Sequence, residues 1–494
     1  MIKLIAAKLF AKIIHFKNQK WINNPLDYQK KIFFNLIKKG ADTDFGKDHN
    51  FHKIKDFSDF QAEVPVIDYE GLRPYIEKML SGKASVLWPG KPLYYAKTSG
   101  TTSGVKYIPL SKASMPTHIT AARDALLNYI YKTGNADFVK GKQIFLQGSP
   151  ILEKTKGINY GRLSGIVAHY VPKYLQKSRM PSWETNCIED WETKVDAIVE
   201  ETFSENMSLI AGIPSWVQMY FERLIERSNT PVGKIFQNFS LFVYGGVNYE
   251  PYRPLFEKLI GRKVDSIELF PASEGFFAYQ DVLGERGLLL LVNNGIFYEF
   301  IKADNFSDKN PKRYTLGQVE LGVNYVLILS TTAGLWGYNI GDTVMFVSLS
   351  PYRIVVTGRI KHYISAFGEH VIGKEVETAM EEVCKLTSIR VKEFTVAPQI
   401  DPKEGLPFHE WLIEFENLPE EIEHFASLLD QKMQKQNAYY EDLIRGKVLR
   451  KLVITRVAPS AFQSYMKSIG KLGGQNKIPR LSNDRKIADK LQIK

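Results

Sequence analysis

Residues 97–106 read Lys-Thr-Ser-Gly-Thr-Thr-Ser-Gly-Val-Lys, a run of small and hydroxylated side chains between two lysines. Such a loop can hold a phosphate, because glycines let backbone N–H groups approach the anion, hydroxyls add donors and lysines supply charge. It is not a Walker A motif, since the lysine does not directly follow the second glycine. A plain surface connection is the alternative. The candidate phosphate ligands are Ser99, Gly100, Thr101, Thr102, Ser103 and Lys106.

A second candidate, Pro-Ala-Ser-Glu-Gly at 271–275, directly follows a predicted strand over 264–270. In a parallel sheet, ligands bind in the crevice outside the carboxyl ends of the strands. A glutamate at Glu274 could bind Mg²⁺ beside phosphate oxygens, directly or through water. The alternative is a helix that begins here, with Ser273 as its N-cap and Glu274 in its first turn.

Three further segments fit a nucleotide ligand: Gly245-Gly246, Gly341-Asp342 and Arg359. The glycine pair ends a predicted strand and would let a flat ring such as adenine approach the backbone. The alternative is that the two glycines form an ordinary turn. The aspartate is expected in a turn between two antiparallel strands, where it could accept hydrogen bonds from ribose hydroxyls. The arginine ends the next strand and could reach a ribose or a phosphate, or it lies on the surface.

These candidates lie in a segment where strand and helix signals alternate, which predicts a mainly parallel sheet with helices on its faces. The predicted strands are 143–147, 209–212, 241–244 and 264–270, and the predicted helices are 191–203, 214–227 and 251–259.

After residue 285 the strand signals follow one another without helices between them, which predicts an antiparallel section. Its strands are expected at 288–292, 296–301, 318–321, 325–330, 342–348 and 352–357. Beyond residue 359 the pattern predicts a compact α+β unit, with helices at 375–383, 420–436 and 461–469 and strands at 391–397, 410–416 and 448–457. We therefore expect a hinge near 359–368 and two domains, 1–363 and 364–494.

Composition narrows the class of protein. The net charge of +11 comes from the two ends of the chain: residues 1–60 hold twelve Lys against six Asp, and residues 461–494 hold eight Lys or Arg against two Asp. No nucleic-acid-binding signature accompanies this charge, so a nucleic-acid partner is not expected.

Two distant cysteines indicate a reducing, cytoplasmic setting. Residues 1–15 form a basic amphipathic pattern without a signal-peptide core, for which packing on the protein is favoured over contact with a membrane.

The order of these segments resembles the adenylate-forming superfamily of acyl-CoA synthetases and luciferases. More closely, the chain resembles the GH3 family of acyl acid–amido synthetases over nearly its full length. Thr98–Lys106 matches the first nucleotide motif of that family, Ala272–Gly275 the second and Ala333–Asp342 the third. Further segments with the family's character are Thr43–Lys47, His409–Glu416, Asn437–Glu441 and Gln475–Arg480.

The resemblance implies an α/β fold, with a large N-terminal adenylate-forming domain and a small α+β C-terminal lid domain. It also implies that ATP and Mg²⁺ are used. It assigns phosphate contacts to Ser99, Thr101, Thr102 and Ser103, further nucleotide contacts to Ala272, Ser273 and Tyr338, Mg²⁺ to Glu274, and the ribose to Asp342. Lys477 is implied to be the lid lysine that approaches the acyl phosphate.

The implied reaction joins a carboxylic acid to an amine, an amino acid by family likeness, through an acyl-adenylate. Plant members read Tyr-Arg-Tyr where this chain has Trp336-Gly337-Tyr338, and residues 360–369 also differ, which points to a bacterial branch. The alternatives are an acyl-CoA ligase that uses the same first step, a non-catalytic nucleotide-binding module on the same fold, and a basic nucleic-acid-binding protein.

Overall fold

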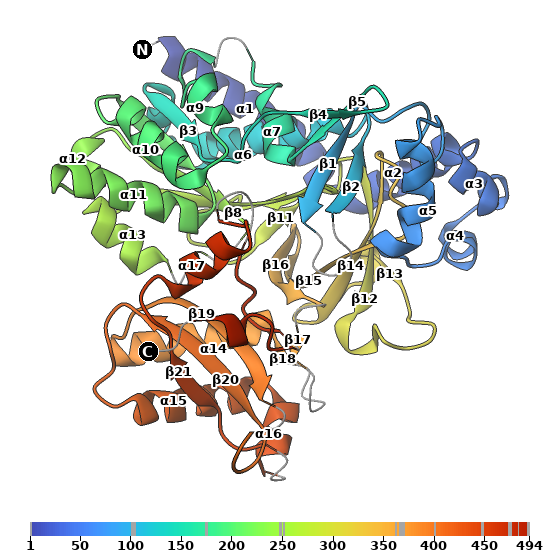
Figure 1. Ribbon diagram of the computed structural model, residues 1–494. Helices are drawn as coiled ribbons and strands as arrows, with labels where there is room; N and C mark the ends of the chain where they lie inside the picture. The colour runs from blue at the N-terminus through green and yellow to red at the C-terminus, as the bar shows by residue number, and fades with distance from the viewer. Residues whose placement is uncertain are drawn as a thin grey trace. The chain divides into compact units, whose positions relative to one another are not determined.

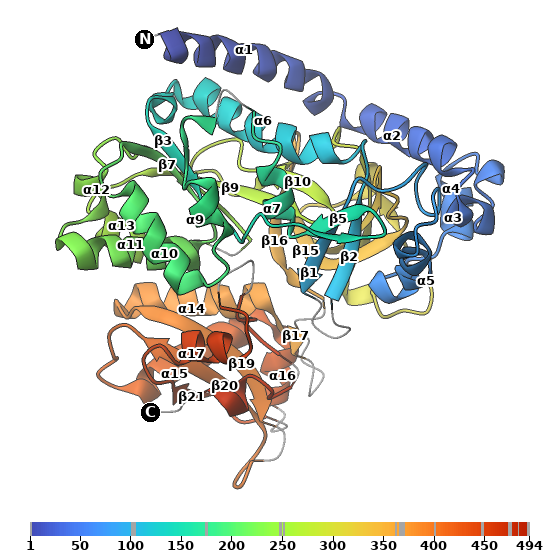
Figure 2. The ribbon, with the colours of Figure 1, turned by 45° about the horizontal axis from the view of Figure 1, so that its top comes forward.

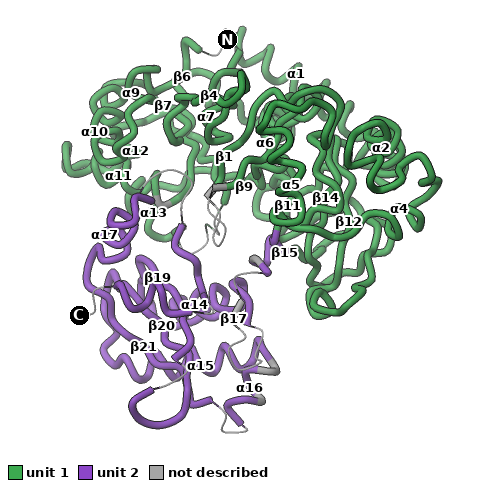
Figure 3. Tube along the Cα trace, turned by 45° about the vertical axis from the view of Figure 1, so that its right-hand side comes forward, with its two compact units in different colours: residues 1–340, 344–355 green, residues 341–343, 356–494 purple. Residues whose placement is uncertain are grey.

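The computed structural model describes residues 2–99, 105–172, 176–246, 249, 252–360, 363–364, 371–399, 402–445, 449–472, 477–482 and 484–491. The chain divides into two compact units, coloured separately in Figure 3. Unit 1 contains residues 1–340 and 344–355, and unit 2 contains residues 341–343 and 356–494. The predicted boundary after residue 363 falls next to 361–362 and 365–370, which lie outside the described residues.

One sheet of twelve strands organises the first unit, in the order β13-β12-β14-β15-β16-β11-β10-β9-β8-β7-β3-β6 (Figure 1). In chain order its strands are β3 (Lys142–Phe145), β6 (Arg179–Met180), β7 (Met207–Ala211), β8 (Leu241–Gly245), β9 (Asp265–Ala272), β10 (Gly275–Tyr279), β11 (Leu288–Leu290), β12 (Ile296–Lys302), β13 (Tyr314–Thr315), β14 (Asn324–Thr331), β15 (Tyr338–Leu349) and β16 (Tyr352–Arg359). Strands β15 and β16 each contribute residues to both units.

The sheet is parallel on one side of β9 and antiparallel on the other. Strands β6, β3, β7, β8 and β9 pair in parallel, as the alternating pattern predicts. From β9 onward β10, β11 and β16 pair in antiparallel fashion, as do β12, β13 and β14. The expected change from parallel to antiparallel strands is confirmed, and it occurs at the hairpin between β9 and β10.

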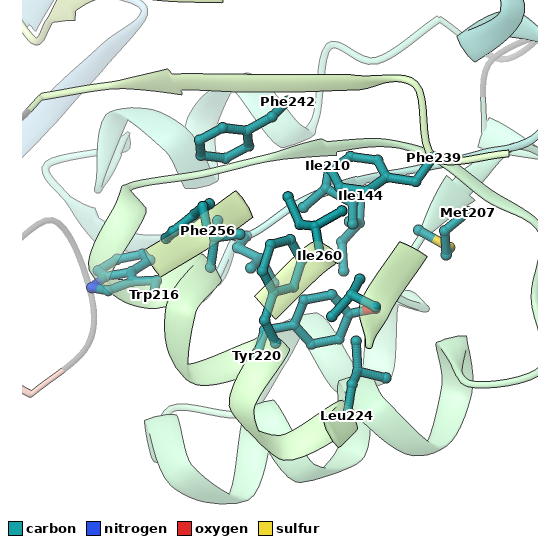
Figure 4. Packing of buried hydrophobic residues seen from close by; sticks show 14 of the residues in the cluster. Ile144, Met207, Ile210, Trp216, Tyr220, Leu224, Phe239, Phe242, Phe256 and Ile260 are labelled. Atoms are coloured by element: carbon teal, nitrogen blue, oxygen red, sulfur yellow. The ribbon is translucent and has the colours of Figure 1, made fainter. Parts of the chain in front are cut away.

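Helices cover both faces of the parallel strands, which bury apolar residues on each side. On one face α10 (Trp191–Thr202), α11 (Pro214–Ser228) and α13 (Arg253–Ile260) enclose an aromatic-rich core (Figure 4). Ile210 of β7 and Phe242 of β8 meet Tyr220 and Phe256 of the helices in this core. On the other face α6 (Met115–Thr133) contacts β9 and β10, and α1 (Ile2–Ile22) packs along α6 (Figure 2).

A separate sheet carries the strands around the first candidate loop. Its order is β2-β1-β5-β4, with β1 (Tyr94–Ser99), β2 (Val105–Leu110), β4 (Glu153–Thr155) and β5 (Ile158–Gly161). Other helices among the described residues of this unit are α2 (Pro25–Gly40), α3 (Asp44–Asp48), α4 (Phe57–Glu63), α5 (Tyr69–Leu80), α7 (Leu163–Ala168), α9 (Trp183–Cys187) and α12 (Val232–Ile235). No helix in the described ranges has the length and apolar content needed to cross a bilayer.

Unit 2 is built on the sheet β19-β20-β21, formed by Val391–Gln399, Phe408–Phe415 and Val453–Arg456. Side chains alternate along β20: Trp411 and Ile413 face α14 (Gly373–Thr387) and α15 (Ile422–Gln436), while Leu412 packs in the core of α17 (Ala461–Ser468). The unit also contains α16 (Ala438–Arg445) and the short pair β17 (Tyr363–Ile364) and β18 (Val371–Ile372). The α+β prediction for this region is confirmed.

Three local predictions were wrong or incomplete. Residues 318–321 do not form a strand: a 3₁₀ turn over Leu316–Gln318 is followed by a single bridge at Leu321. Strand β10 was missed, because its apolar run follows the preceding strand after only two residues. The predicted strand 448–457 is shorter, since β21 covers Val453–Arg456.

A buried histidine gives unit 1 a pH-dependent stability. His118 of α6 is 4% exposed, and its Nδ1 has no hydrogen-bond partner among the described residues. Burial lowers the pKa of this imidazole to about 4. The unfolded ring, with its ordinary pKa of 6.5, takes up a proton first as the pH falls. Stability should therefore decline from about pH 6.5 down to about pH 4, and by roughly 2 kcal/mol between pH 7 and pH 5.

Urea unfolding followed by circular dichroism at pH 7, 6 and 5 measures this decline. A His118→Gln variant has no group that titrates at this position. Between pH 7 and pH 5 its free energy of unfolding should fall by roughly 2 kcal/mol less than that of the wild type. Equal pH dependence in the two proteins would contradict the assignment.

Candidate functional site

The first candidate loop joins the two strands of an antiparallel hairpin. Strand β1 ends at Ser99, which pairs with Val105 of β2. Residues 100–104, with Gly100, Thr101, Thr102 and Ser103, lie outside the described residues, as does the Ser99 side chain. Lys106 stands at the start of β2, and its ammonium lies 5.6 Å from the centre of the Tyr69 ring.

A short segment that leads into the first residue of α5 connects this hairpin to the third candidate motif. The Tyr69 hydroxyl accepts a hydrogen bond from the Tyr107 amide at 2.9 Å. Two residues earlier, Ile67 forms a parallel bridge with Tyr338, and its carbonyl accepts a hydrogen bond from Asn339 N at 2.8 Å. Lys106 and Tyr338, which are far apart in the sequence, are therefore brought to the two ends of one three-residue segment.

Sequence reasoning missed this connecting segment. The signal was weak: Val64-Pro-Val-Ile67 is a short β-favouring run ahead of the Asp68 that caps α5. Its partner could not be read from local pattern, because the bridge spans residues distant in sequence.

The second candidate motif is the tight turn of the β9–β10 hairpin. Ala272 pairs with Gly275, so Ser273 and Glu274 are the two residues of the turn. The alternative of a helix that begins at Ser273 is therefore wrong, because a strand follows. Since β9 is parallel to β8, this turn lies beyond the carboxyl ends of the parallel strands, where ligands bind in such sheets. Ala272, Ser273 and Glu274 are all partly exposed there.

The glycine pair after β8 has a structural explanation of its own. A Cβ on Gly245 would lie 2.5 Å from the Leu269 carbonyl oxygen of β9, so this position needs glycine for the strands to pair. Gly246 has φ of +83°, in the region that favours glycine. That a flat ring such as adenine lies against the backbone of Gly245 and Gly246 stays a prediction.

Asp342 was expected where a Gly-Asp turn meets the predicted strand 342–348, and the strand is present while the turn is not. It stands inside β15, directly after Gly341, whose φ of +85° marks an irregular point in the strand. The Gly341 carbonyl accepts a hydrogen bond from Ile360 N at 2.6 Å. The backbones of Asp342 and Arg359, each next to one of these residues, are therefore close together within unit 2. Arg359 ends β16 as predicted, and its side chain lies outside the described part of the chain.

The first half of the third motif serves the core rather than a ligand. Trp336 is fully buried, and its Nε1 donates a hydrogen bond to the Leu87 carbonyl at 2.9 Å. The Phe45 ring stacks with it at a centroid distance of 6.2 Å, so the Thr43–Lys47 segment packs against this motif. A Cβ on Gly40 would lie 2.6 Å from the same indole. Packing in the core therefore explains why Thr43–Lys47 and Trp336 resemble the family motifs.

Gly337, where the plant pattern has arginine, sits against the connecting segment. Its φ is +52°, and a Cβ there would lie 2.5 Å from the Pro65 carbonyl oxygen. Its own carbonyl accepts a hydrogen bond from Ile67 N at 3.0 Å. The backbone of residues 64–67 therefore occupies the space that a side chain at position 337 would need, which explains why this chain has glycine there and not arginine.

Lys477 begins a segment that is fixed to β19. The Pro479 carbonyl accepts a hydrogen bond from Thr395 Oγ1 at 2.7 Å, and the Arg480 carbonyl accepts one from Val396 N at 2.9 Å. The Arg480 guanidinium also pairs with the carboxylates of Glu377 and Glu393. Lys477 itself is exposed and stands at the start of this anchored segment of unit 2.

Other family-like residues of unit 2 are structural. His409 is buried and stacks on Tyr440 at 5.1 Å between ring centroids. The Tyr440 hydroxyl donates to Asp430 Oδ1 at 2.8 Å, and Asn437 Oδ1 accepts from Tyr440 N at 2.8 Å. Over the described residues, no group of three His, Cys, Asp or Glu side chains is arranged to hold a metal ion.

Comparison with protein families finds three models that match in order along the chain. The GH3 family N-terminal domain matches residues 17–187, the central domain residues 289–359 and the C-terminal domain residues 374–486. The matched ranges contain the loop at 99–106, Tyr338, Asp342 and Lys477, while Glu274 lies between the first two.

Among curated relatives, the jasmonoyl–L-amino acid synthetase JAR4 of Nicotiana attenuata is 20% identical, over 82% of each chain. The indole-3-acetic acid-amido synthetase GH3.3 of Arabidopsis thaliana is 21% identical, over 92% of this chain and 88% of its own length.

Two solved structures share the fold. The GH3.15 acyl acid amido synthetase superposes with a TM-score of 0.79 at 15% identity, over 95% of this chain and 94% of its own. A 2-hydroxyisobutyryl-CoA ligase in the postadenylation state gives a TM-score of 0.59 at 12% identity, over 93% of this chain and 90% of its own. The adenylate-forming fold expected from the sequence is confirmed.

Proposed function

Because this chain belongs to the GH3 family, we propose that it is an ATP-dependent ligase that adenylates a carboxylic acid and transfers the acyl group to an amine. The names of two relatives, jasmonoyl–L-amino acid synthetase and indole-3-acetic acid-amido synthetase, support an amino acid as the acceptor. The observation that carries the proposal is the convergence of Lys106 and Tyr338 on the Ile67–Tyr69 segment. It supports a single nucleotide site, because Lys106 of the candidate phosphate loop and Tyr338 of the third candidate motif lie at the two ends of this three-residue segment.

In the first half-reaction a carboxylate oxygen of the acid attacks the α-phosphorus of ATP, and the bond from that phosphorus to the pyrophosphate oxygen breaks. The substrate is its own nucleophile, so the protein's task is positioning and charge stabilisation. We assign the phosphates to the loop residues Ser99–Ser103 and Lys106, the adenine and its surroundings to Gly245, Gly246, Ala272, Ser273 and Tyr338, and the ribose to Asp342 and Arg359.

Mg²⁺ fits this arrangement through Glu274. Magnesium in nucleotide sites takes one or two carboxylates and completes its shell with phosphate oxygens and water, so a cluster of protein ligands is not required. A single, partly exposed carboxylate in a fixed turn at the carboxyl edge of the sheet meets that need. The ion would neutralise charge on the phosphates during adenylation.

In the second half-reaction the amine nitrogen attacks the acyl carbonyl, the C–O bond to AMP breaks, and the amine loses a proton. We propose that unit 2 acts as the lid, with a change of conformation between the two half-reactions. We also propose that the chain is cytoplasmic and belongs to a branch apart from the plant enzymes, as Gly337 and residues 360–369 suggest.

Pyrophosphate release tests the function. The protein would be given ATP, Mg²⁺ and a panel of carboxylic acids, with and without mixed amino acids and, separately, with CoA. Acid-dependent release that turns over only with amino acids is the expected result. Turnover only with CoA would make it an acyl-CoA ligase, and ATP binding without release across the panel would favour a non-catalytic binder.

Replacing Lys477 tests the lid assignment. Lys477→Ala should slow acid-dependent pyrophosphate release by about tenfold or more, because a cation that stabilises charge at the acyl phosphate is lost. Lys490→Ala removes another exposed lysine of unit 2 and should leave the rate unchanged. If both variants retain the wild-type rate, Lys477 has no part in adenylation.

A further inference from the structure

Helix α1 has two apolar faces on opposite sides, and the described residues of unit 1 cover only one of them. Ala11, Ile14 and Trp21 are buried on the inner side, where α1 packs along α6. Asn18 Nδ2 donates to Asp124 Oδ2 of α6 at 3.3 Å, and His15 stacks on Tyr131 at 3.7 Å between ring centroids. These contacts fix which side of α1 faces outward.

The outer face is a stripe of five large apolar side chains. Its members are Ile2, Ile5, Leu9, Ile13 and Phe16, exposed by 85%, 55%, 58%, 63% and 56% respectively. Their spacings of three, four, four and three residues place them on one side of a helix with 3.6 residues per turn. A continuous apolar stripe of this length on an exposed helix indicates a surface that binds something.

Lysines border the stripe on both sides. Helix α1 holds five, at positions 3, 8, 12, 17 and 20, and no aspartate or glutamate. All five are exposed. On a helical wheel Lys8 and Lys12 fall on one flank of the stripe, Lys3 and Lys17 fall on the other, and Lys20 lies in line with it beyond Phe16. An apolar stripe between two cationic borders matches the boundary between acyl chains and anionic headgroups in a bilayer.

We propose that the outer face of α1 binds an anionic membrane surface, with the helix lying in the plane of that surface. The five apolar side chains would enter the headgroup–acyl boundary, while the lysine stems extend along it and place their ammonium groups among the lipid phosphates. Self-association through this face is disfavoured, because it would bring the lysines of two identical helices together. The inference does not depend on the ligase function.

Binding to vesicles tests the proposal directly. The whole protein would be sedimented with vesicles of phosphatidylcholine alone and with vesicles that contain an equal share of phosphatidylglycerol. We expect binding to the anionic vesicles that weakens as salt is raised, since screening reduces the lysine contribution. Binding of the protein with Leu9→Gln and Ile13→Gln together should be at least about tenfold weaker, because two side chains that enter the membrane are lost.

A second variant and a control make the result decisive. Lys8→Gln with Lys12→Gln should weaken binding by about twenty-fivefold, at roughly fivefold per lysine. Leu386→Gln removes an equally exposed leucine of α14, 64% exposed, and should bind as the wild type does. Absence of binding to anionic vesicles, equal loss in the Leu386 variant, or a dimer in solution that the Leu9/Ile13 variant breaks would each overturn the proposal.

Discussion

Glu274→Gln should lower acid-dependent pyrophosphate release by at least about a hundredfold, which is typical for removing one charge-stabilising group from an active site. The amide keeps the shape of the side chain but cannot bind Mg²⁺ as a carboxylate does. Because the residue occupies a partly exposed two-residue turn, the fold should be unaffected. The rate should be measured together with the midpoint of thermal unfolding.

Glu257→Gln is the matched control, because it removes an exposed carboxylate from α13 of the same unit. Its rate should equal that of the wild type. If Glu274→Gln weakens the binding of Mg²⁺ without abolishing it, a higher Mg²⁺ concentration should restore part of the activity of this variant. Wild-type release by Glu274→Gln at low Mg²⁺ would refute the assignment.

Restoring the plant residue at position 337 should damage this protein rather than improve it. We expect Gly337→Ala to lower the free energy of unfolding by about 3 kcal/mol, from a left-handed backbone and a clash with a fixed carbonyl. The Cβ would lie 2.5 Å from Pro65 O, and the segment cannot retreat without breaking the Ile67–Tyr338 bridge. Gly337→Arg should be worse, and urea unfolding checks both.

A second glycine separates backbone strain from the clash. Gly284 has φ of +75°, and a Cβ there would meet nothing within 4 Å. Gly284→Ala should therefore cost only about 1 kcal/mol, the conformational part alone. Equal losses at Gly284 and Gly337 would show that the Pro65 contact is not responsible.

The sequence predicted the parts of the fold that depend on local pattern. Buried strands such as β8 and amphipathic helices such as α11 were found within one or two residues, because periodicity and terminal residues are local signals. Strand β10 was missed since its apolar run follows β9 after a turn of only two residues. Asp342 was expected in a turn because Gly-Asp is a turn signal, whereas long-range pairing holds it within β15.

The candidate site could be predicted as a set of residues but not as a geometry. Trp336 and Phe45 lie in family-like motifs and yet pack against each other in the core. The Ile67–Tyr69 segment, which has no motif, brings Lys106 and Tyr338 to one place. Motif matching cannot separate these cases, because a residue can be required for packing or for chemistry and its identity alone does not say which.

The two-residue turn of the β9–β10 hairpin constrains the length of the chain as well as its composition. One inserted residue at 273–274 would shift β10 against β9 and turn its side chains to the opposite face of the sheet. Strand β10 pairs with β11, and β11 with β16, so the displacement would spread through the antiparallel half. Insertions should therefore be tolerated in open loops, such as the one around Gly284, and rejected at this turn. A substitution at this turn would alter the chemistry of a side chain, whereas a change in the length of the turn would alter the register of the strands.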